Sequence, residues 1–350
     1  MTMTDEVLFE RKGHAGLMVL NRPKALNALT HDMVKAMYTQ LCEWELDPEV
    51  RHIVIKSNSE KAFCAGGDIR QVAQAGPEKA GETVQFFADE YRLNARMKSC
   101  TKPLVALIDG IVMGGGVGIS VHGQYRVGSE KTMFAMPETG IGFFPDVGGG
   151  YFLPRLPKAI GYYCALTAER LGQSDCLWTG ILTHAVPGER FAELEAALCE
   201  AQEAGPILDS FGVSQVGEAP IAAKADLIES CFGVESTQQI FENLSMLEAG
   251  EGAEFAHKTL EVLSGRSPTS IEVAFRQLQK GAKLSMNDCM IMEYRIVSQI
   301  LQGHDFYEGV RAVLIDKDHA PKWQPARMDE LKTVDVEAHF MQPKGGDLVL

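Results

Sequence analysis

The sequence predicts an α/β protein whose strands and helices are followed by a mainly helical region. Aliphatic runs typical of buried strands alternate with amphipathic helical runs through the first half of the chain. After about residue 187 the strand signals fade while helical patterns continue. The 350 residues are 45% hydrophobic and 23% charged, which is typical of a globular protein with a sizeable core. We expect a mixed core over residues 1–187 and a helical region packed on it over residues 188–350.

Helical segments separate the strands of the first half, which favours parallel pairing. Between the first two strands, residues 30–46 have apolar side chains at helical spacing, and Thr30 is the expected N-cap. The expected strands are 16–23, 51–57, 102–110 and two short ones within 124–136. The amphipathic helices expected after residue 187 are 191–202, 236–247, 253–264, 270–281 and 286–301.

The charge and the cysteines limit the partners and the compartment. A formal net charge of −14 argues against nucleic acid and anionic membranes, since both need basic patches. The eight cysteines are scattered without a CxxC pair or zinc-like spacing, so we expect reduced, mostly buried thiols and no metal. The first residues lack the pattern of a leader, and the apolar segment 104–121 contains Asp109 and five glycines. We therefore expect a cytoplasmic protein without a membrane helix.

Two glycine-rich segments follow strand-like runs, and each precedes a helical run. They are "FCAGGDIR" (63–70) and "GIVMGGGVGIS" (110–120). This geometry directs backbone N–H groups forward, and glycine lets another group approach the backbone closely. Two such donor sets could converge on one oxygen, as a carbonyl that develops negative charge requires. Either segment alone is explained as well by tight strand–helix packing. The dinucleotide-binding, P-loop and nucleophile-elbow patterns are not met.

Three carboxylates stand in apolar surroundings. Glu138 and Asp146 lie in "AMPETGIGFFPD" (135–146), and buried carboxylates are costly unless something needs them. The alternative is structural: the two acids cap helices or bind Arg155. On the helix expected over 82–98, Glu90 shares the apolar stripe, either as a salt-bridged structural residue or as a polar wall of a pocket.

Taken in order, four segments resemble the enoyl-CoA hydratase/isomerase (crotonase) superfamily: "NRPKALNAL" (21–29), "FCAGGDI" (63–69), "GIVMGGGVGIS" (110–120) and "MPETGIGFFPDVGG" (136–149). Residues 122–127, 136–156 and 305–326 are similar, within that superfamily, to its branch of 3-hydroxyisobutyryl-CoA hydrolases. The resemblance implies a crotonase-like spiral of ββα repeats, with an oxyanion hole and a coenzyme A site in residues 1–187.

The resemblance also implies an activity: hydrolysis of a short-chain 3-hydroxyacyl-CoA thioester, with 3-hydroxyisobutyryl-CoA of valine catabolism as the expected substrate. The only partner implied is this small molecule, with no separate cofactor because coenzyme A is part of the substrate. Assembly of several copies of the chain stays open. The alternatives are a hydratase or isomerase of the same fold and a non-catalytic acyl-CoA-binding protein.

The resemblance carries site roles onto matching positions. Glu138 and Asp146 are the implied catalytic acids, and the amides of Gly67 and Gly115 form the implied oxyanion hole. The implied substrate pocket is lined by Glu90, Gly115, Glu138 and Asp146, and the implied coenzyme A contacts are Lys24, Ala65 and Ile69. Hydratases of this superfamily carry a glutamate three residues after the middle glycine of "GGG", where this chain has Gly118. That departure agrees with the hydrolase branch.

Overall fold

The computed structural model describes residues 4–213, 216–247 and 252–350. By packing, the chain divides into two compact units. Unit 1 comprises Met1–Asp68, Asp89–Ala135 and Arg170–Ala222. Unit 2 comprises Ile69–Ala88, Met136–Glu169 and Ala223–Leu350. This grouping follows packing, and the expected division at residues 187 and 188 stays a prediction.

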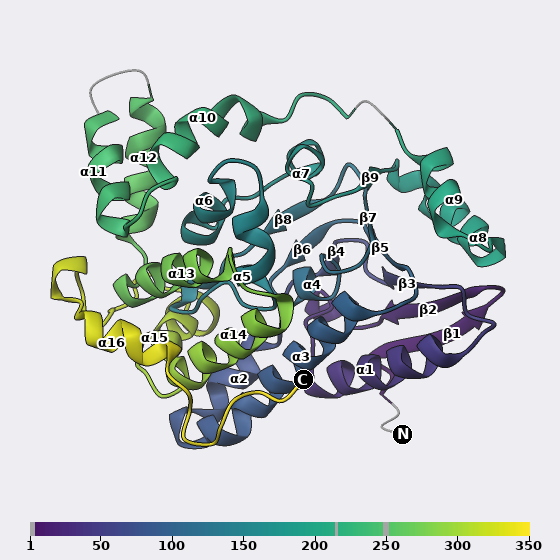
Figure 1. The fold of residues 1–350 in the computed structure, drawn as a ribbon, viewed down its shortest axis with the longest axis horizontal. Helices are drawn as coiled ribbons and strands as arrows, with labels where there is room; N and C mark the ends of the chain where they lie inside the picture. Colours follow the sequence, from purple (N-terminus) through teal and green to yellow (C-terminus); the bar gives the residue numbers. More distant parts are fainter. Residues whose placement is uncertain (1–3, 214–215, 248–251) are drawn as a thin grey trace. The chain divides into compact units, whose positions relative to one another are not determined.

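Unit 1 contains both β-sheets of the described chain (Figure 1). The larger sheet has the order β1-β2-β3-β5-β7-β9, with β1 antiparallel to β2 and all other pairs parallel. Its strands are β1 (Val7–Lys12), β2 (Ala15–Leu20), β3 (His52–Ser57), β5 (Leu104–Ile108), β7 (Tyr125–Gly128) and β9 (His184–Ala185). The smaller, fully parallel sheet consists of β4 (Ala62–Cys64), β6 (Ile111–Met113) and β8 (Met133–Ala135).

From β3 onward, consecutive strands alternate between the two sheets. The chain runs from β3 to β4, from β5 to β6 and from β7 to β8, so each turn of the spiral adds one strand to each sheet. Helices α2 (Ile69–Ala75) and α3 (Ala80–Ser99) follow β4, and the short α4 (Gly115–Gly118) follows β6. This is a ββα repeat, and parallel pairing within each sheet follows from it because successive strands of one sheet enter from the same side.

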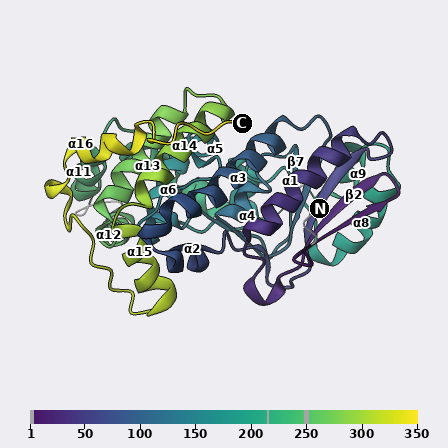
Figure 2. The same cartoon turned by 90° about the horizontal axis from the view of Figure 1, so that it is seen from below.

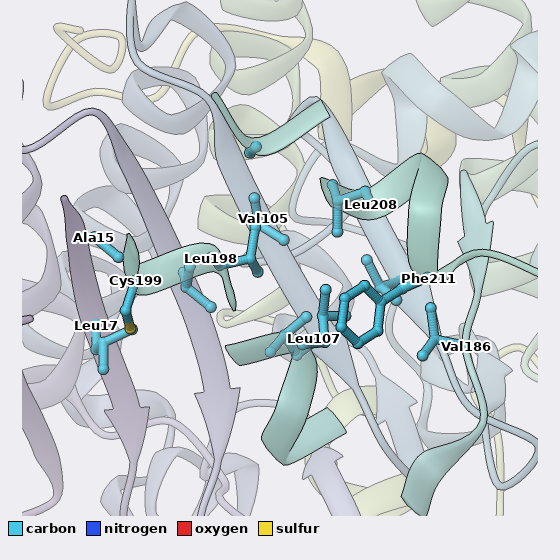
Figure 3. Close-up of a cluster of buried hydrophobic side chains, with 13 residues drawn as sticks. Ala15, Leu17, Val105, Leu107, Val186, Leu198, Cys199, Leu208 and Phe211 are labelled. Carbon is cyan, nitrogen blue, oxygen red and sulfur yellow. The ribbon is translucent and has the colours of Figure 1, made fainter. Parts of the chain in front are cut away.

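One face of the larger sheet is covered by α8 (Phe191–Glu200), which packs against β2, and by α9 (Ala204–Phe211), which packs against α8 (Figure 2). Alternate residues of the strands point to this face, as the period of two along a strand requires. Figure 3 shows the resulting cluster of buried side chains, whose labelled members are Ala15, Leu17, Val105, Leu107, Val186, Leu198, Cys199, Leu208 and Phe211. Their burial provides most of what holds these two helices to the sheet.

Unit 2 is helical. Helix α13 packs against α5, α6 and α14, and these helices stay side by side in Figures 1 and 2. The principal helices are α5 (Gly149–Phe152), α6 (Ile160–Thr167), α10 (Pro220–Phe232), α11 (Thr237–Leu247), α12 (Ala253–Ser264), α13 (Pro268–Gly281), α14 (Met286–Ile300), α15 (Asp305–Val310) and α16 (Thr333–Glu337). Across the described ranges, no helix is long and apolar enough to cross a membrane.

Most expected elements are confirmed within a few residues. The helix expected over 30–46 is α1 (His31–Leu46), and the Thr30 hydroxyl caps it by accepting the Met33 amide at 3.2 Å. The glycine segments come after β3 and β5, as expected, but the sequence analysis did not identify the short strands β4 and β6 that lie between.

Candidate active site

The two glycine segments leave neighbouring strands of the smaller sheet. Strands β4 and β6 pair in parallel, so their carboxyl ends lie at the same edge. The stretch from Ala65 to Asp68 follows β4, while Gly114 follows β6 and opens helix α4. The φ angle of Gly114 is +48°, in the region that favours glycine, so the chain can turn sharply there. The predicted proximity of the two segments therefore has a simple cause in the pairing of β4 with β6.

Within unit 1, Gly115 lies against Gly67 and Glu90. A methyl group on Gly115 would stand 3.2 Å from the amide nitrogen of Gly67 and 2.6 Å from the Oε1 atom of Glu90. A methyl group on Gly66 would in turn stand 3.9 Å from the amide nitrogen of Gly115. The absence of side chains at these glycines is what allows both peptide groups and the Glu90 carboxyl to approach one another.

The amides of Gly67 and Gly115 are not used by the surrounding backbone. Leu29 forms a short parallel β-bridge with Gly67. In this bridge the Leu29 amide donates to the Gly66 carbonyl at 2.8 Å, and the Leu29 carbonyl accepts the Asp68 amide at 2.9 Å, so the amide of Gly67 is not used. Among the described residues, neither Gly67 nor Gly115 donates its amide to a protein acceptor. Buried backbone N–H groups are normally paired, and two that are left over can bind an oxygen of a ligand.

Glu90 lies on α3, where its side chain is only 2% exposed. The charge of Glu90 and, more strongly, burial raise the pKa of the nearby Cys64 thiol to about 12. A thiol with so high a pKa holds almost no thiolate at neutral pH, which excludes Cys64 as a nucleophile. Of these two side chains, the carboxyl of Glu90 remains as the candidate for a polar role beside Gly115.

The expected coenzyme A contacts lie around the loop before α1. Lys24 is an exposed residue of a short 3₁₀ helix (Pro23–Ala25), and the Ala65 amide donates to the Leu26 carbonyl at 3.0 Å. Ile69 is the first residue of α2. Lys24 and Ala65 therefore share one region of unit 1, and Ile69 follows it directly in the chain.

Asn27 supports this loop, and the sequence analysis did not single it out. The fully buried Asn27 side chain donates to the Ser57 hydroxyl at 2.7 Å and to the Phe63 carbonyl at 3.0 Å, and it accepts the Arg22 amide at 2.8 Å. Its φ of +56° is one that asparagine tolerates better than most residues. The feature of the sequence that could have identified Asn27 is its position within "NRPKALNAL", one of the segments that resemble the superfamily.

Glu138 and Asp146 both lie in unit 2, on one continuous loop. Glu138 begins a 3₁₀ helix (Glu138–Ile141), and both acids are buried, with 6% and 5% of their surfaces exposed. Between them Phe143 packs against other rings, with centroid distances of 4.8 Å to Phe144, 5.3 Å to Phe306 and 5.5 Å to Phe87. The segment between the two acids is therefore anchored in an aromatic cluster of unit 2.

The structural alternative for these acids involved Arg155. The Arg155 guanidinium donates to the carbonyls of Tyr151, Gly281, Ala282 and Leu284, the last at 3.0 Å. It also stacks on the Tyr151 ring, 3.9 Å from the centroid. Arg155 pairs with no carboxylate in the part of the chain that the structure describes, so it is not the partner of these acids, whereas the helix-capping alternative stays open.

A third acid of unit 2, which the sequence analysis missed, holds the loop that carries Asp146. The Glu293 carboxyl on α14 accepts the Gly148 amide at 2.8 Å and the Gly150 amide at 2.9 Å. Gln277 on α13 donates to the same carboxyl at 3.0 Å and to the Pro145 carbonyl at 2.7 Å. The available signal was the one used for Glu90, since Glu293 is a carboxylate in the apolar stripe of an amphipathic helix.

Burial raises the pKa of Glu293 to about 8, with the negative charge of Asp146 adding to the effect and the amides of Gly148 and Gly150 opposing it. The folded protein therefore keeps a proton that the unfolded chain loses above its ordinary pKa of 4.5. Because the folded state binds more protons in this window, the contribution of Glu293 to the free energy of unfolding falls as the pH rises from 4.5 to about 8.

We expect Glu293→Gln to remove this pH dependence. The difference in unfolding midpoint between the wild type and the variant should shrink as the pH rises through the window from 4.5 to about 8, because only the wild type carries the titrating group. Denaturant unfolding of both proteins across that window measures it. A difference in unfolding midpoint that stays constant across this pH range would show that Glu293 is already ionised in the folded state.

The chain is similar to known proteins along almost its whole length. The profile of the enoyl-CoA hydratase/isomerase family matches residues 15–340. The chain belongs to this family. The Rattus norvegicus protein named 3-hydroxyisobutyryl-CoA hydrolase, mitochondrial, is 47% identical over 358 residues, which cover 99% of this chain and 91% of the relative. The Homo sapiens protein of the same name is 46% identical, with 98% and 90% covered.

Two solved structures of enoyl-CoA hydratase/isomerase relatives share the fold. One is described as a carnitinyl-CoA dehydratase from Mycobacterium thermoresistibile, with a TM-score of 0.92, 36% identity and 98% of both chains covered. The other is described as an enoyl-CoA hydratase from Rhodobacter sphaeroides 2.4.1, with a TM-score of 0.91, 32% identity, and 99% of this chain and 100% of the other covered. The expected α/β crotonase fold with a helical C-terminal region is confirmed.

Proposed function

We propose that this protein hydrolyses a short-chain 3-hydroxyacyl-CoA thioester, with 3-hydroxyisobutyryl-CoA as substrate and 3-hydroxyisobutyrate and coenzyme A as products. The observation that carries the proposal is the identity of 46–47% with relatives that bear this hydrolase name, extending over 98–99% of the chain. Identity over the full length includes the loops on which a site depends, whereas likeness of fold alone would leave the reaction open.

The amides of Gly67 and Gly115 hold the thioester oxygen in this mechanism. When a nucleophile attacks the carbonyl carbon, negative charge develops on that oxygen, and preorganised N–H donors stabilise it. Support comes from two features of unit 1: both glycines lie together at the end of β4 and β6, and neither amide has a protein acceptor among the described residues. Removing one such donor typically raises the barrier by ~2.7–4 kcal/mol.

Glu138 drives the attack, either as a general base that takes a proton from water or as a nucleophile that forms a mixed anhydride. In both routes the carbon–sulfur bond breaks, one water is consumed, and coenzyme A leaves as a thiol after receiving a proton. Asp146 supplies that proton or orients the water. Glu90 binds the 3-hydroxyl group of the substrate.

Coenzyme A binds along the loop that contains Lys24, with contacts from the backbone near Ala65 and Ile69. The exposed ammonium of Lys24 suits a phosphate of the cofactor portion of the substrate. No separate cofactor takes part in the reaction, because hydrolysis of a thioester needs only water and acid–base groups.

Hydration of an enoyl-CoA is the rival activity within the fold, and the names of the two solved structures favour considering it. Addition of water across a double bond uses two carboxylates around one water in the hydratases that this chain resembles. The position of one of them is Gly118, which lies within α4 and has no side chain to offer. This residue supports hydrolysis over hydration.

A thiol-release assay tests the proposal. The wild-type protein is mixed with 3-hydroxyisobutyryl-CoA and a thiol-reactive dye, and the same preparation is mixed with crotonyl-CoA while the enoyl absorbance is followed. We expect rapid thiol release in the first assay and no loss of absorbance in the second. Loss of enoyl absorbance without thiol release would assign a hydratase. Calorimetric binding without either reaction would assign a non-catalytic binding protein.

The cytoplasmic location expected from the N-terminal sequence stays a prediction. The names of the rat and human relatives include the word mitochondrial, which is a statement about those proteins. Fractionation of the source cells, with the hydrolase activity followed across compartments, tests the location directly. The assembly state is a separate expectation that light scattering of the purified protein measures.

A further inference from the structure

The turn that carries Asp146 is clamped from both sides by two buried side chains. Gln277 holds the carbonyl of Pro145, the residue before Asp146, at 2.7 Å. The Glu293 carboxyl accepts hydrogen bonds from the amides of Gly148 and Gly150, two residues that follow Asp146, at 2.8 Å and 2.9 Å. A further bond of 3.0 Å joins Gln277 to Glu293, so the two side chains act as one unit.

The turn that follows Asp146 has backbone angles that are unfavourable without supporting contacts. Val147 directly follows Asp146 and has a φ of +50°, which is a rare conformation for a β-branched residue. Gly148 comes next, with a φ of +88°. Such strained residues persist only where the surrounding contacts hold them, and they concentrate at functional sites.

The packing at the clamp leaves little room for adjustment. A methyl group on Gly150 would stand 3.1 Å from both the Glu293 Oε1 atom and the Gln277 Nε2 atom. Both side chains are fully buried, with 0% of their surfaces exposed. Burying a carboxyl costs free energy unless it is hydrogen-bonded, and the hydrogen bonds of Glu293 are made to the backbone of the turn that carries Asp146.

We propose that Glu293, together with Gln277, is a positioning residue that fixes the direction of the Asp146 carboxyl through the backbone of residues 145–150. This inference rests on the role of Asp146 under the proposed function. The pair acts through main-chain groups and does not touch the reacting atoms. The raised pKa of Glu293, to which the charge of Asp146 contributes, agrees with the two carboxyls lying close enough to influence each other.

The variant Glu293→Gln tests the proposal in the full-length protein. A glutamine of the same shape keeps one acceptor but places an NH₂ group against one of the two amides, so the turn loses one anchor. We expect kcat for thiol release to fall by about 10- to 100-fold, because small displacements of a catalytic group are costly, while KM changes little. Thermal unfolding of each variant is recorded first, and every assay is run well below its midpoint.

Asp175→Asn is the matched control. Asp175 is also a buried carboxylate that accepts two main-chain amides, those of Ile221 at 2.8 Å and Gly172 at 3.3 Å, but it holds α7 (Gln173–Thr179) in unit 1. We expect this variant to lose stability and to keep its kcat. A similar loss of kcat in both variants would mean that any weakened buried carboxylate lowers activity, which would overturn the proposal.

A double-mutant cycle with Asp146→Asn decides whether Glu293 acts through Asp146. In the Asp146→Asn background we expect Glu293→Gln to cause no further loss, because there is no longer a catalytic carboxyl to position. An equal fold-loss in both backgrounds would overturn the inference. If Asp146→Asn alone keeps the wild-type rate, the proposed function of Asp146 fails, and that result is distinct from a failure of the positioning role.

Gln277→Met provides a second route should Glu293→Gln fold poorly. Methionine keeps the length of the side chain but cannot donate a hydrogen bond. The variant therefore loses the bonds to the Pro145 carbonyl and to the Glu293 carboxyl. We expect the same pattern, a lower kcat with little change in KM and no additional effect in the Asp146→Asn background. A folded Gln277→Met protein with the wild-type kcat would contradict the proposal.

Discussion

Glu138→Gln should lower kcat for thiol release by ~10²–10⁴-fold with little change in KM. Glutamine has nearly the same shape, so it fills the buried position at the start of the 3₁₀ helix, but it can neither take a proton from water nor attack the thioester. Steady-state rates with 3-hydroxyisobutyryl-CoA measure the loss. We expect binding through coenzyme A to be kept, because Glu138 is not among its proposed contacts.

Glu254→Gln is a suitable control for this substitution. Glu254 lies on α12, is paired with Lys258 at 2.6 Å on the protein surface, and has no place in the proposed machinery. We expect its kcat to equal that of the wild type, since exposed ion pairs contribute little. A Glu138→Gln protein that is folded and as active as this control would remove Glu138 from the mechanism.

A single turnover in heavy-oxygen water distinguishes the two routes open to Glu138. If Glu138 is the nucleophile and water then attacks the Glu138 carbonyl of the anhydride, the bridging Glu138 oxygen leaves with the product, and the first turnover releases unlabelled acid and a labelled Glu138. If it is a general base, the label appears in the product at once. Either outcome is compatible with the thioester hydrolase, so this experiment refines the mechanism independently of the proposed function.

Gly115→Ala is expected to reduce kcat by ~10²-fold or more, the size of effect that follows the loss of one oxyanion-hole donor. The added methyl group would stand 2.6 Å from the Glu90 Oε1 atom, so that carboxyl must move, and 3.2 Å from the Gly67 amide nitrogen, which is a tight contact with backbone. We expect the peptides of residues 67 and 115 to separate slightly, which would disturb the proposed alignment of the two donors. Thiol-release kinetics measure the effect.

Gly81→Ala gives the matched control for an added methyl group. Gly81 lies near the start of α3, and a methyl group placed there has no atom within 4 Å. We expect this variant to keep the wild-type kcat and to gain about 0.5–1 kcal/mol of stability from the better helix former. Wild-type kinetics in Gly115→Ala, with binding unchanged, would contradict the assignment of an oxyanion hole to Gly67 and Gly115.

Local patterns predicted the longer elements because each pattern lies within one segment of chain. The helix over residues 30–46 was predicted together with its Thr30 cap, since helical spacing and a capping hydroxyl are both visible in sequence. The three-residue strands β4 and β6 were not, although they carry the glycine loops. Their identity as strands comes from pairing with each other, which no local pattern records.

The sequence by itself identified Glu90, Glu138 and Asp146 as acids among apolar residues, the glycines that permit close approach, and the superfamily that the chain resembles. Only the tertiary structure decided that Gly67, Gly115 and Glu90 gather at one sheet edge in unit 1, because parallel pairing of β4 with β6 brings their ends together. Only the tertiary structure decided that Glu293 and Gln277 hold the Asp146 turn in unit 2. Such contacts join residues far apart in the chain, and their existence depends on how whole elements pack rather than on any local preference.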